Sequence, residues 1–365
     1  MAAAGDGAAR RGAAAVNAPF QRDGLRFPWD APPEPGRATE VAEGILWMRL
    51  PLPMALDHVN VYALADEDGW TIVDAGLSWQ TGRALWGELL AGPLAGRPVA
   101  RVLVTHAHPD HVGLTAWLAR DGATILMPRT AWLMARMLTL DVQDRPSAEA
   151  RAFWRLNGMD PAEYARRLDE RPFNFADCVD LLPPGHTRLV EGGILRLAGR
   201  SWDIRMGDGH APEHATLWAR EEPLVIAGDQ LLPGISPNIG VHPTEPEADP
   251  LGEWIASCRR LAPHARENQL VLPGHKLPYR GLPTRLDQLE ANHHGALARL
   301  EAHLAEPRRG GECFPPLFRR EIGRGVYGLA FAETVAHLNH LVATGRARRW
   351  LAEDGAWRWQ ANAAA

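Results

Sequence analysis

A dense group of metal-ligating side chains follows a short apolar segment, and this feature constrains the fold of the chain most. Residues 102–104 (VLV) predict a buried strand, and the next residues are THAHPDH at 105–111, followed by Gly113, where we expect a helix to begin. The run holds His106, His108, Asp110 and His111. In a strand-to-helix loop, side chains two positions apart can converge. Imidazole and carboxylate groups suit Zn, Mn or Fe, so the run predicts a metal site at a sheet edge.

Four more candidate residues stand at the ends of other apolar segments. They are Asp74 after residues 71–73, His210 after 202–206, Asp229 after 224–227 and His275 after 270–272. A glycine lies next to or near each of them, and glycine lets the backbone approach a metal site closely. If these strands end at one rim, all the candidates can gather there.

The remaining pattern favours an α+β fold in which helices flank sheets. Strand-length apolar segments occupy residues 59–64, 70–73, 99–104, 124–127, 202–206, 216–219, 224–227 and 270–272, and helical spacing occupies 84–90 and 114–119. We interpret residues 1–37 as a flexible tail and 38–283 as the catalytic domain, with a helical insertion at 129–178. Residues 284–365 form a small winged-helix-like domain, predicted from helices at 286–304, 315–321 and 331–343 and a hairpin at 347–351 and 356–359. His293 and His294 on its first helix are expected to be solvated.

Composition limits the classes of partner. A hydrophobic content of 46% allows a large core, and a net charge of -5 gives no general attraction to nucleic acid or to anionic membranes. A local basic group, Arg346, Arg348, Arg349 and Arg358, is where nucleic acid would bind if any did. The three cysteines are too scattered for a disulfide framework. No apolar run has the length of a secretion signal or the ~20 residues of a membrane span, so we expect a cytoplasmic protein without a membrane partner.

The candidate residues together resemble the metallo-β-lactamase fold superfamily, through its His-x-His-x-Asp-His signature and the four further positions in order, over residues 45–280. The resemblance implies a four-layered αβ/βα sandwich and two divalent metal ions, Zn or else Mn or Fe. It implies that one ion is held by His106, His108 and His210 and the other by Asp110, His111 and His275. Asp229 would bridge them, and Asp74 would orient the ligand loop by hydrogen bonding.

The implied mechanism is hydrolysis by a hydroxide that bridges the two metals, with Asp110 as the catalytic residue that orients or shuttles a proton. Residues 209–214 (GHAPEH) resemble glyoxalase II-like thioesterases, while the C-terminal pattern resembles the LACTB2-like branch. We favour a small ester, thioester or lactone, because the insertion is rich in Trp and Met.

Other functions stay open. They are a LACTB2-like single-strand endoribonuclease or phosphodiesterase, amide hydrolysis of the β-lactamase type, and a binding protein with a vestigial metal site. The oligomeric state is open, with a homodimer among the possibilities. For the remaining histidines near the motifs, His214 is expected to make a structural hydrogen bond and His58 to pack in the core.

Overall fold

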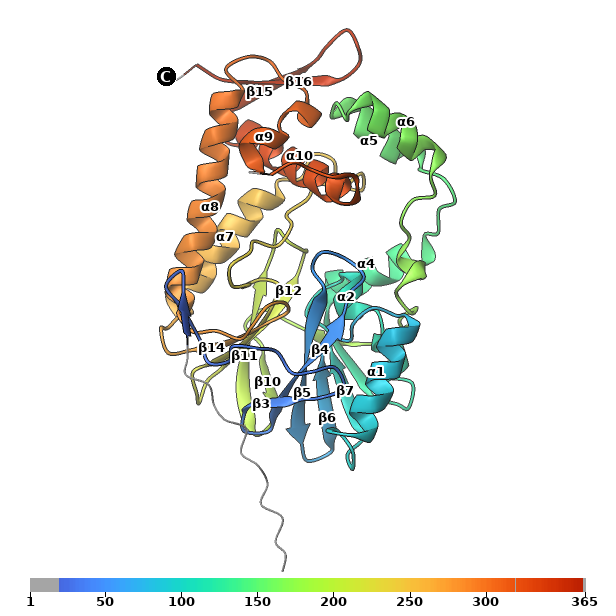
Figure 1. Cartoon of the computed structure of the whole chain (residues 1–365), viewed down its shortest axis with the longest axis vertical. Coiled ribbons are helices and arrows are strands. Elements are labelled where there is room, and N and C mark those ends of the chain that lie inside the picture. The colour runs from blue at the N-terminus through green and yellow to red at the C-terminus, as the bar shows by residue number, and fades with distance from the viewer. Residues whose placement is uncertain (1–19, 319, 364–365) are drawn as a thin grey trace, which may run out of the picture.

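The computed structural model of the chain describes residues 20–318 and 320–363, and within them two sheets lie face to face (Figure 1). The seven-stranded sheet contains β3 (Thr39–Ala42), β4 (Ile45–Pro51), β5 (His58–Asp66), β6 (Gly69–Val73), β7 (Val99–Leu103), β8 (Thr124–Pro128) and β9 (Thr187–Leu189), in that order. The five-stranded sheet contains β10 (Ile194–Leu197), β11 (Arg200–Gly207), β12 (His214–Ala219), β13 (Leu224–Gly228) and β14 (Leu270–Pro273).

Both sheets combine antiparallel and parallel pairs. Strands β3 to β6 pair in an antiparallel manner, whereas β6 to β9 are parallel. In the second sheet β10 to β13 are antiparallel, and β13 and β14 are parallel. Strands β6 and β13 are buried along their whole length, as expected for strands with both faces covered.

Helices cover the outer face of each sheet, which completes a four-layered αβ/βα sandwich. Trp47 and Trp202 pack in the core between the sheets, and Trp86 packs between the seven-stranded sheet and its helices. The helices of the chain are α1 (Gln80–Ala91), α2 (Pro109–Val112), α3 (Thr115–Leu118), α4 (Arg129–Leu140), α5 (Ala148–Leu156), α6 (Pro161–Asp169), α7 (Pro250–Leu261), α8 (Leu282–His303), α9 (Phe314–Leu317) and α10 (Tyr327–Ala343), with 3-10 turns η1 (Phe175–Asp177), η2 (Ala262–His264), η3 (Gly310–Glu312) and η4 (Arg324–Val326).

A second group of elements lies at one end of the sandwich, at the top of Figure 1. It contains α5, α6, α9, α10 and the hairpin of β15 (Ala347–Leu351) and β16 (Trp357–Ala361). Phe153 of α5 and Phe331 of α10 share a small apolar core there. Helix α8 runs from the sandwich to this group and packs against α9 and β16. The predicted order of three helices and a hairpin is therefore present.

All eight strands expected from apolar segments are present. The structure also contains elements that were not expected, and some helices begin or end at other residues than expected. The sequence pattern did not predict β3, β4, β9, β10 or α7. The helix after the ligand run begins at Pro109 rather than at Gly113, because proline fits the first position of a helix. Asp110 and His111 therefore lie on a short helix, not in a loop. The helix expected at 315–321 ends at Leu317.

Two further expectations were wrong. His293 is 1% exposed, because α10 packs over it and His337 lies 3.4 Å from its Nδ1 atom; His294 is exposed as expected. Residues 20–37, expected within the flexible tail, are packed on the domain, whereas 1–19 lie outside the described residues.

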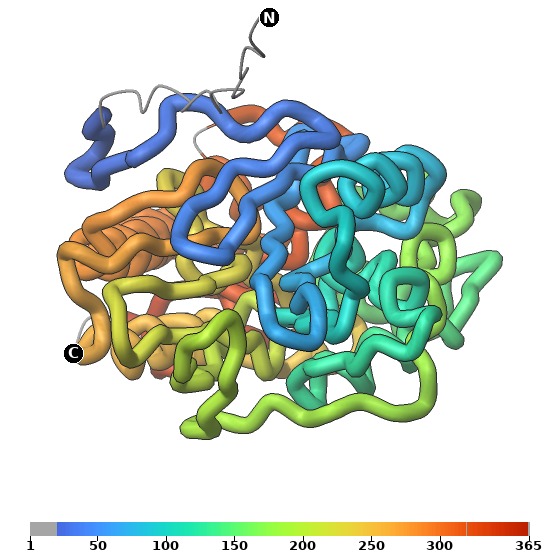
Figure 2. Tube along the Cα trace, turned by 90° about the horizontal axis from the view of Figure 1, so that it is seen from below, coloured from blue at the N-terminus to red at the C-terminus, as the bar shows by residue number. Residues whose placement is uncertain are grey.

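The packed N-terminal segment begins with the hairpin of β1 (Phe20–Arg22) and β2 (Leu25–Phe27). Arg26 and Arg280 exchange two main-chain hydrogen bonds, and Leu25 is 1% exposed. Figure 2 shows this dark-blue hairpin beside the orange segment that leads into α8. The segment was not predicted because its many Pro, Arg and acidic residues surround only two core residues, Leu25 and Phe27.

The three cysteines are free, as expected. Within the described part of the chain, no helix combines the length and the apolar character needed to cross a membrane.

Replacing Leu25 by Ala tests the packing of the N-terminal segment. We expect Leu25→Ala to lower the free energy of unfolding by about 2–5 kcal/mol, since it leaves a cavity in a core. Urea unfolding followed by circular dichroism measures the change, and Arg22→Ala on exposed β1 is the matched control. Equal unfolding midpoints for Leu25→Ala and the wild type would show that the segment does not contribute to the fold.

Candidate metal centre

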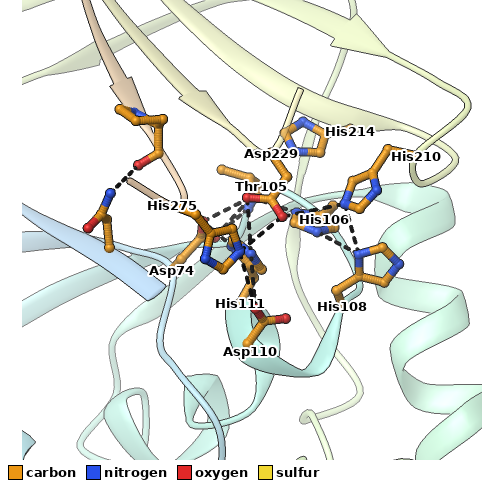
Figure 3. A network of polar contacts seen from close by, with 12 residues as sticks. Asp74, Thr105, His106, His108, Asp110, His111, His210, His214, Asp229 and His275 are labelled. Atoms are coloured by element: carbon orange, nitrogen blue, oxygen red, sulfur yellow. Dashed lines mark hydrogen bonds and ion pairs between the residues drawn. The ribbon is translucent and has the colours of Figure 1, made fainter. Parts of the chain in front are cut away.

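Three imidazoles converge at the rim where the two sheets meet (Figure 3). The Nε2 atom of His106 lies 2.9 Å from Nδ1 of His108, which lies 3.0 Å from Nε2 of His210. His106 and His108 follow β7, and His210 lies in the turn between β11 and β12. Three nitrogens that face one another at this spacing form one face of a candidate cation site.

A second group lies beside the first. It consists of Asp110, His111 and His275, and the Nε2 atom of His275 lies 3.4 Å from Asp110 Oδ2. Asp229 stands between the two groups. Its Oδ2 atom lies 3.5 Å from His210 Nε2 and 3.2 Å from His275 Nε2, and its Oδ1 atom lies 3.4 Å from His111 Nε2. All seven residues expected to be ligands are thus gathered at one site.

The donor atoms of the site fit divalent cations. Within each of three overlapping groups the candidate ligand atoms lie within 4.8 Å of one another. The Nε2 atom of His111 and the Oδ1 atom of Asp229 are buried and make no hydrogen bond to any described residue. Buried polar atoms without partners are costly, and a cation between them would satisfy both.

Asp74 connects the end of β6 to the ligand run, as expected. Its Oδ1 atom accepts a hydrogen bond from the Thr105 main chain at 2.8 Å, and its Oδ2 atom accepts from His111 Nδ1 at 2.8 Å. The Thr105 hydroxyl also donates to the carboxylate and lies 3.0 Å from His106 Nδ1. Asp74 has a φ of 61°, a conformation that Asp tolerates better than most residues. These bonds fix the outer nitrogens of two candidate ligands and leave their Nε2 atoms facing the site.

The outer nitrogens of two other histidines use main-chain acceptors. His210 Nδ1 donates to the Asn238 carbonyl at 2.8 Å, and His275 Nδ1 donates to the His58 carbonyl at 2.6 Å. The sequence pattern missed the carbonyls of Asn238 and His58, because a main-chain acceptor leaves no signal in residue type. It also missed Thr105, whose hydroxyl contacts both Asp74 and His106. The buried His58 ring accepts from the main-chain nitrogen of Lys276, so it does more than pack.

Gly274 and Gly228 allow the backbone to pass close to the side chains of the site, and His214 holds the backbone of Asp229. A Cβ atom on Gly274 would lie 2.2 Å from Asp229 Oδ1 and 2.8 Å from His111 Cε1, so no side chain fits there. His214 Nε2 accepts a hydrogen bond from the Asp229 main chain at 3.0 Å, which confirms its predicted structural role. Gly228 has a φ of 48°, and a Cβ there would contact the His214 ring at 2.6 Å.

The two halves of the site differ in the charge that they favour on their histidines. Burial, with the charges of neighbouring histidines, lowers the pKa of His106 and of His108 well below the usual value, so both rings are neutral and able to bind a cation. Burial opposes the charging of His275, but the carboxylates of Asp229 and Asp110 raise its pKa to about 9. Burial also opposes the charging of His111, but the same carboxylates and Asp74 raise its pKa. The carboxylates therefore favour positive charge in this half of the site, and a bound cation would supply it in place of the protons of the two imidazoles.

The Asp74→Asn variant tests the role of Asp74. The amide cannot accept hydrogen bonds from both Thr105 and His111, so we expect a loss of metal affinity of about 10–100-fold. Competition with a chromophoric chelator measures it. The control is Asp66→Asn, at the end of β5 that is far from the site. Asp66 Oδ1 also accepts a main-chain hydrogen bond, from Ala198, so the same substitution disturbs a similar bond away from the ligands. Equal affinities for both variants and the wild type would contradict the role of Asp74.

Comparison with known proteins identifies the family of the chain. The family model described as "Metallo-beta-lactamase superfamily" matches residues 54–302, and the one described as "Metallo-beta-lactamase-like, C-terminal domain" matches residues 297–362. A Bacillus subtilis (strain 168) protein described as probable metallo-hydrolase YqjP is 24% identical over 314 residues, which is 82% of this chain and 93% of the relative.

Two solved structures are also similar over most of their length. A beta-lactamase domain protein from Burkholderia ambifaria is 35% identical with a TM-score of 0.84, covering 93% of this chain and 97% of that one. A metallo-beta-lactamase family protein from Thermus thermophilus is 28% identical with a TM-score of 0.73, covering 88% of this chain and 100% of that one. With a family match over more than half of its length, the chain belongs to the metallo-β-lactamase superfamily and is a metal-dependent hydrolase.

Proposed function

We propose that the chain is a two-metal hydrolase that acts on a small ester, thioester or lactone. The observation that carries the proposal is the position of Asp229, whose two oxygens lie within 3.5 Å of histidines from both candidate groups. A carboxylate between two sets of ligands suits a pair of cations better than a single one. His106, His108 and His210 would hold one ion, and Asp110, His111 and His275 the other. Neutral imidazoles with carboxylates suit zinc, with manganese or iron as alternatives.

Divalent cations bound there would polarise a substrate oxygen and lower the pKa of a water molecule toward ~7. The chain's own contribution is to hold this chemistry in place and to move a proton. Asp110 is suited to accept and release this proton, because its side chain is the most exposed of the four compared. It is 19% exposed, against 0% for His111, 2% for His275 and 7% for Asp229. It is the carboxylate of the site that water and substrate reach most readily, which supports its assignment as the catalytic residue.

An apolar stripe on α4, the helix whose first turn contacts the segment that carries His210, supports an acyl substrate. The main-chain nitrogen of Thr130, in the first turn of α4, donates to the Glu213 carboxylate, three residues from His210. Further along α4, Leu133, Met137 and Leu140 are spaced along one face of the helix, and each is about half exposed or more. Exposed apolar stripes of this kind suit the binding of an apolar group.

The basic group of the C-terminal segment is largely neutralised within the chain. Arg346 pairs with Glu301, Arg349 with Glu247, and Arg358 with Asp354. Arg348 donates to Gln360 and lies over the Trp350 ring. Paired arginines offer little free charge to a phosphate backbone, which supports a small substrate rather than RNA.

We further propose a winged-helix arrangement for the segment from α8 to β16 and descent from the LACTB2-like branch. The order of three helices and a hairpin supports the arrangement. We also propose that the protein is cytoplasmic and that its partner is a small-molecule substrate.

A substrate panel on metal-reconstituted protein tests the function. We expect turnover of acyl esters, thioesters or lactones, loss of turnover on chelation, and recovery on adding metal. Asp229→Asn should lower kcat about 100-fold or more, since it weakens the link between the two halves of the site. Turnover that survives chelation, or turnover of phosphodiesters alone, would contradict the proposal.

Substitution of the basic group separates ester hydrolysis from RNA cleavage. We expect the Arg348→Ala/Arg349→Ala double variant to keep kcat/KM for the ester within about twofold, with little dependence on salt. A nuclease that used this surface would lose affinity for single-stranded RNA steeply with salt. Measuring both activities from about 50 to about 300 mM salt, a range over which screening of exposed charges strengthens, decides between them.

A further inference from the structure

A long segment between β13 and α7 carries the main-chain acceptor of His210. Residues 229–249 form no helix or strand, so main-chain pairing with a sheet does not hold the Asn238 carbonyl in position. Loops of this length in compact domains are uncommon and are mostly functional or mobile. The position of the acceptor therefore depends on what holds residues 238–241, which we call the acceptor segment.

Helix α10 holds the acceptor segment at three points. The main-chain nitrogen of Val241 donates to the Ala332 carbonyl at 3.1 Å. The side-chain amide of Asn238 donates to Glu333 Oε2 at 2.8 Å and to the Leu329 carbonyl at 3.2 Å. Helix α10 belongs to the C-terminal group of elements, so a residue late in the chain contacts a segment that orients a candidate ligand.

Asn238 thus links Glu333 to the metal centre. Its side chain binds Glu333, and its carbonyl accepts from Nδ1 of His210 at 2.8 Å. That bond turns the Nε2 atom of His210 toward the site, 3.0 Å from His108 Nδ1. We propose that Glu333 is a positioning residue, which sets the orientation of His210 through Asn238.

The environment of Glu333 supports this role. Among the described residues, no Lys, Arg or His forms an ion pair with it. Burial raises the pKa of Glu333 to about 7, and the hydrogen bond from Asn238 acts in the opposite direction. A carboxyl group that is costly to bury and has no cationic partner contributes little to stability by itself. Its hydrogen bond to the acceptor segment is the specific contact that it makes.

Glutamate-to-alanine and glutamate-to-glutamine variants at position 333 test the inference, which rests on the proposed metal site. Apo-protein is titrated with Zn²⁺ against a chromophoric chelator and with Co²⁺ by visible absorption. We expect Glu333→Ala to weaken one of two binding steps about 10-fold or more and to change the Co²⁺ spectrum. Glu333→Gln should stay within about threefold of the wild type, because its amide oxygen can still accept from Asn238.

A double-mutant cycle separates positioning from general damage. Asn238→Ala also removes the bond to the Leu329 carbonyl, so it should lose at least as much affinity as Glu333→Ala. The double variant should be no worse than Asn238→Ala, because that change alone already removes the link to Glu333. Additive losses would overturn the inference. Glu301→Ala, which breaks the half-buried pair between α8 and Arg346, is the control and should bind metal as the wild type does. Circular dichroism and the urea midpoint establish that each variant is folded.

The outcomes also distinguish this inference from the function on which it rests. A wild type that binds two equivalents of metal, with Glu333→Ala indistinguishable from it, overturns the role of Glu333 alone. A wild type that binds no divalent metal overturns both.

Discussion

The metal centre is possible because the ends of strands from both sheets are held together at one rim by main-chain hydrogen bonds. The Asn60 main chain of β5 donates to the Gly274 carbonyl at 2.7 Å, and Ala215 of β12 donates to the Thr105 carbonyl at 2.8 Å. The Tyr62 hydroxyl adds a bond to the Pro273 carbonyl at 2.8 Å. Because these bonds cross from one sheet to the other, a ligand run after β7 can face His210, Asp229 and His275 from the opposite sheet.

Holding this many polar groups in a buried rim costs free energy. The fold offsets part of that cost by giving four of the candidate histidines a fixed partner on the outer side, such as Asp74 for His111 and the His58 carbonyl for His275. The inner nitrogens and oxygens remain directed at one another. The site is therefore preorganised for cations, and binding a cation requires little reordering of the chain.

The ligand set could be predicted from the sequence because its members lie shortly after the ends of apolar strands, and these strand ends gather at one edge. The orientation of those ligands could not, since Asn238 and Glu333 act through a carbonyl and a contact between segments about 95 residues apart. The same reason explains the errors at Leu25 and His293, whose burial depends on partners far along the chain. Periodicity located eight strands of the two sheets, whereas the short edge strands carried too few residues to show a pattern.

Anomalous diffraction from a crystal grown with zinc tests the central claim most directly. The account predicts two anomalous peaks per chain a few ångströms apart, one contacted by His106, His108 and His210 and the other by Asp110, His111 and His275, with Asp229 touching both. A single anomalous peak per chain at a saturating zinc concentration, or peaks away from these residues, would contradict a two-metal centre.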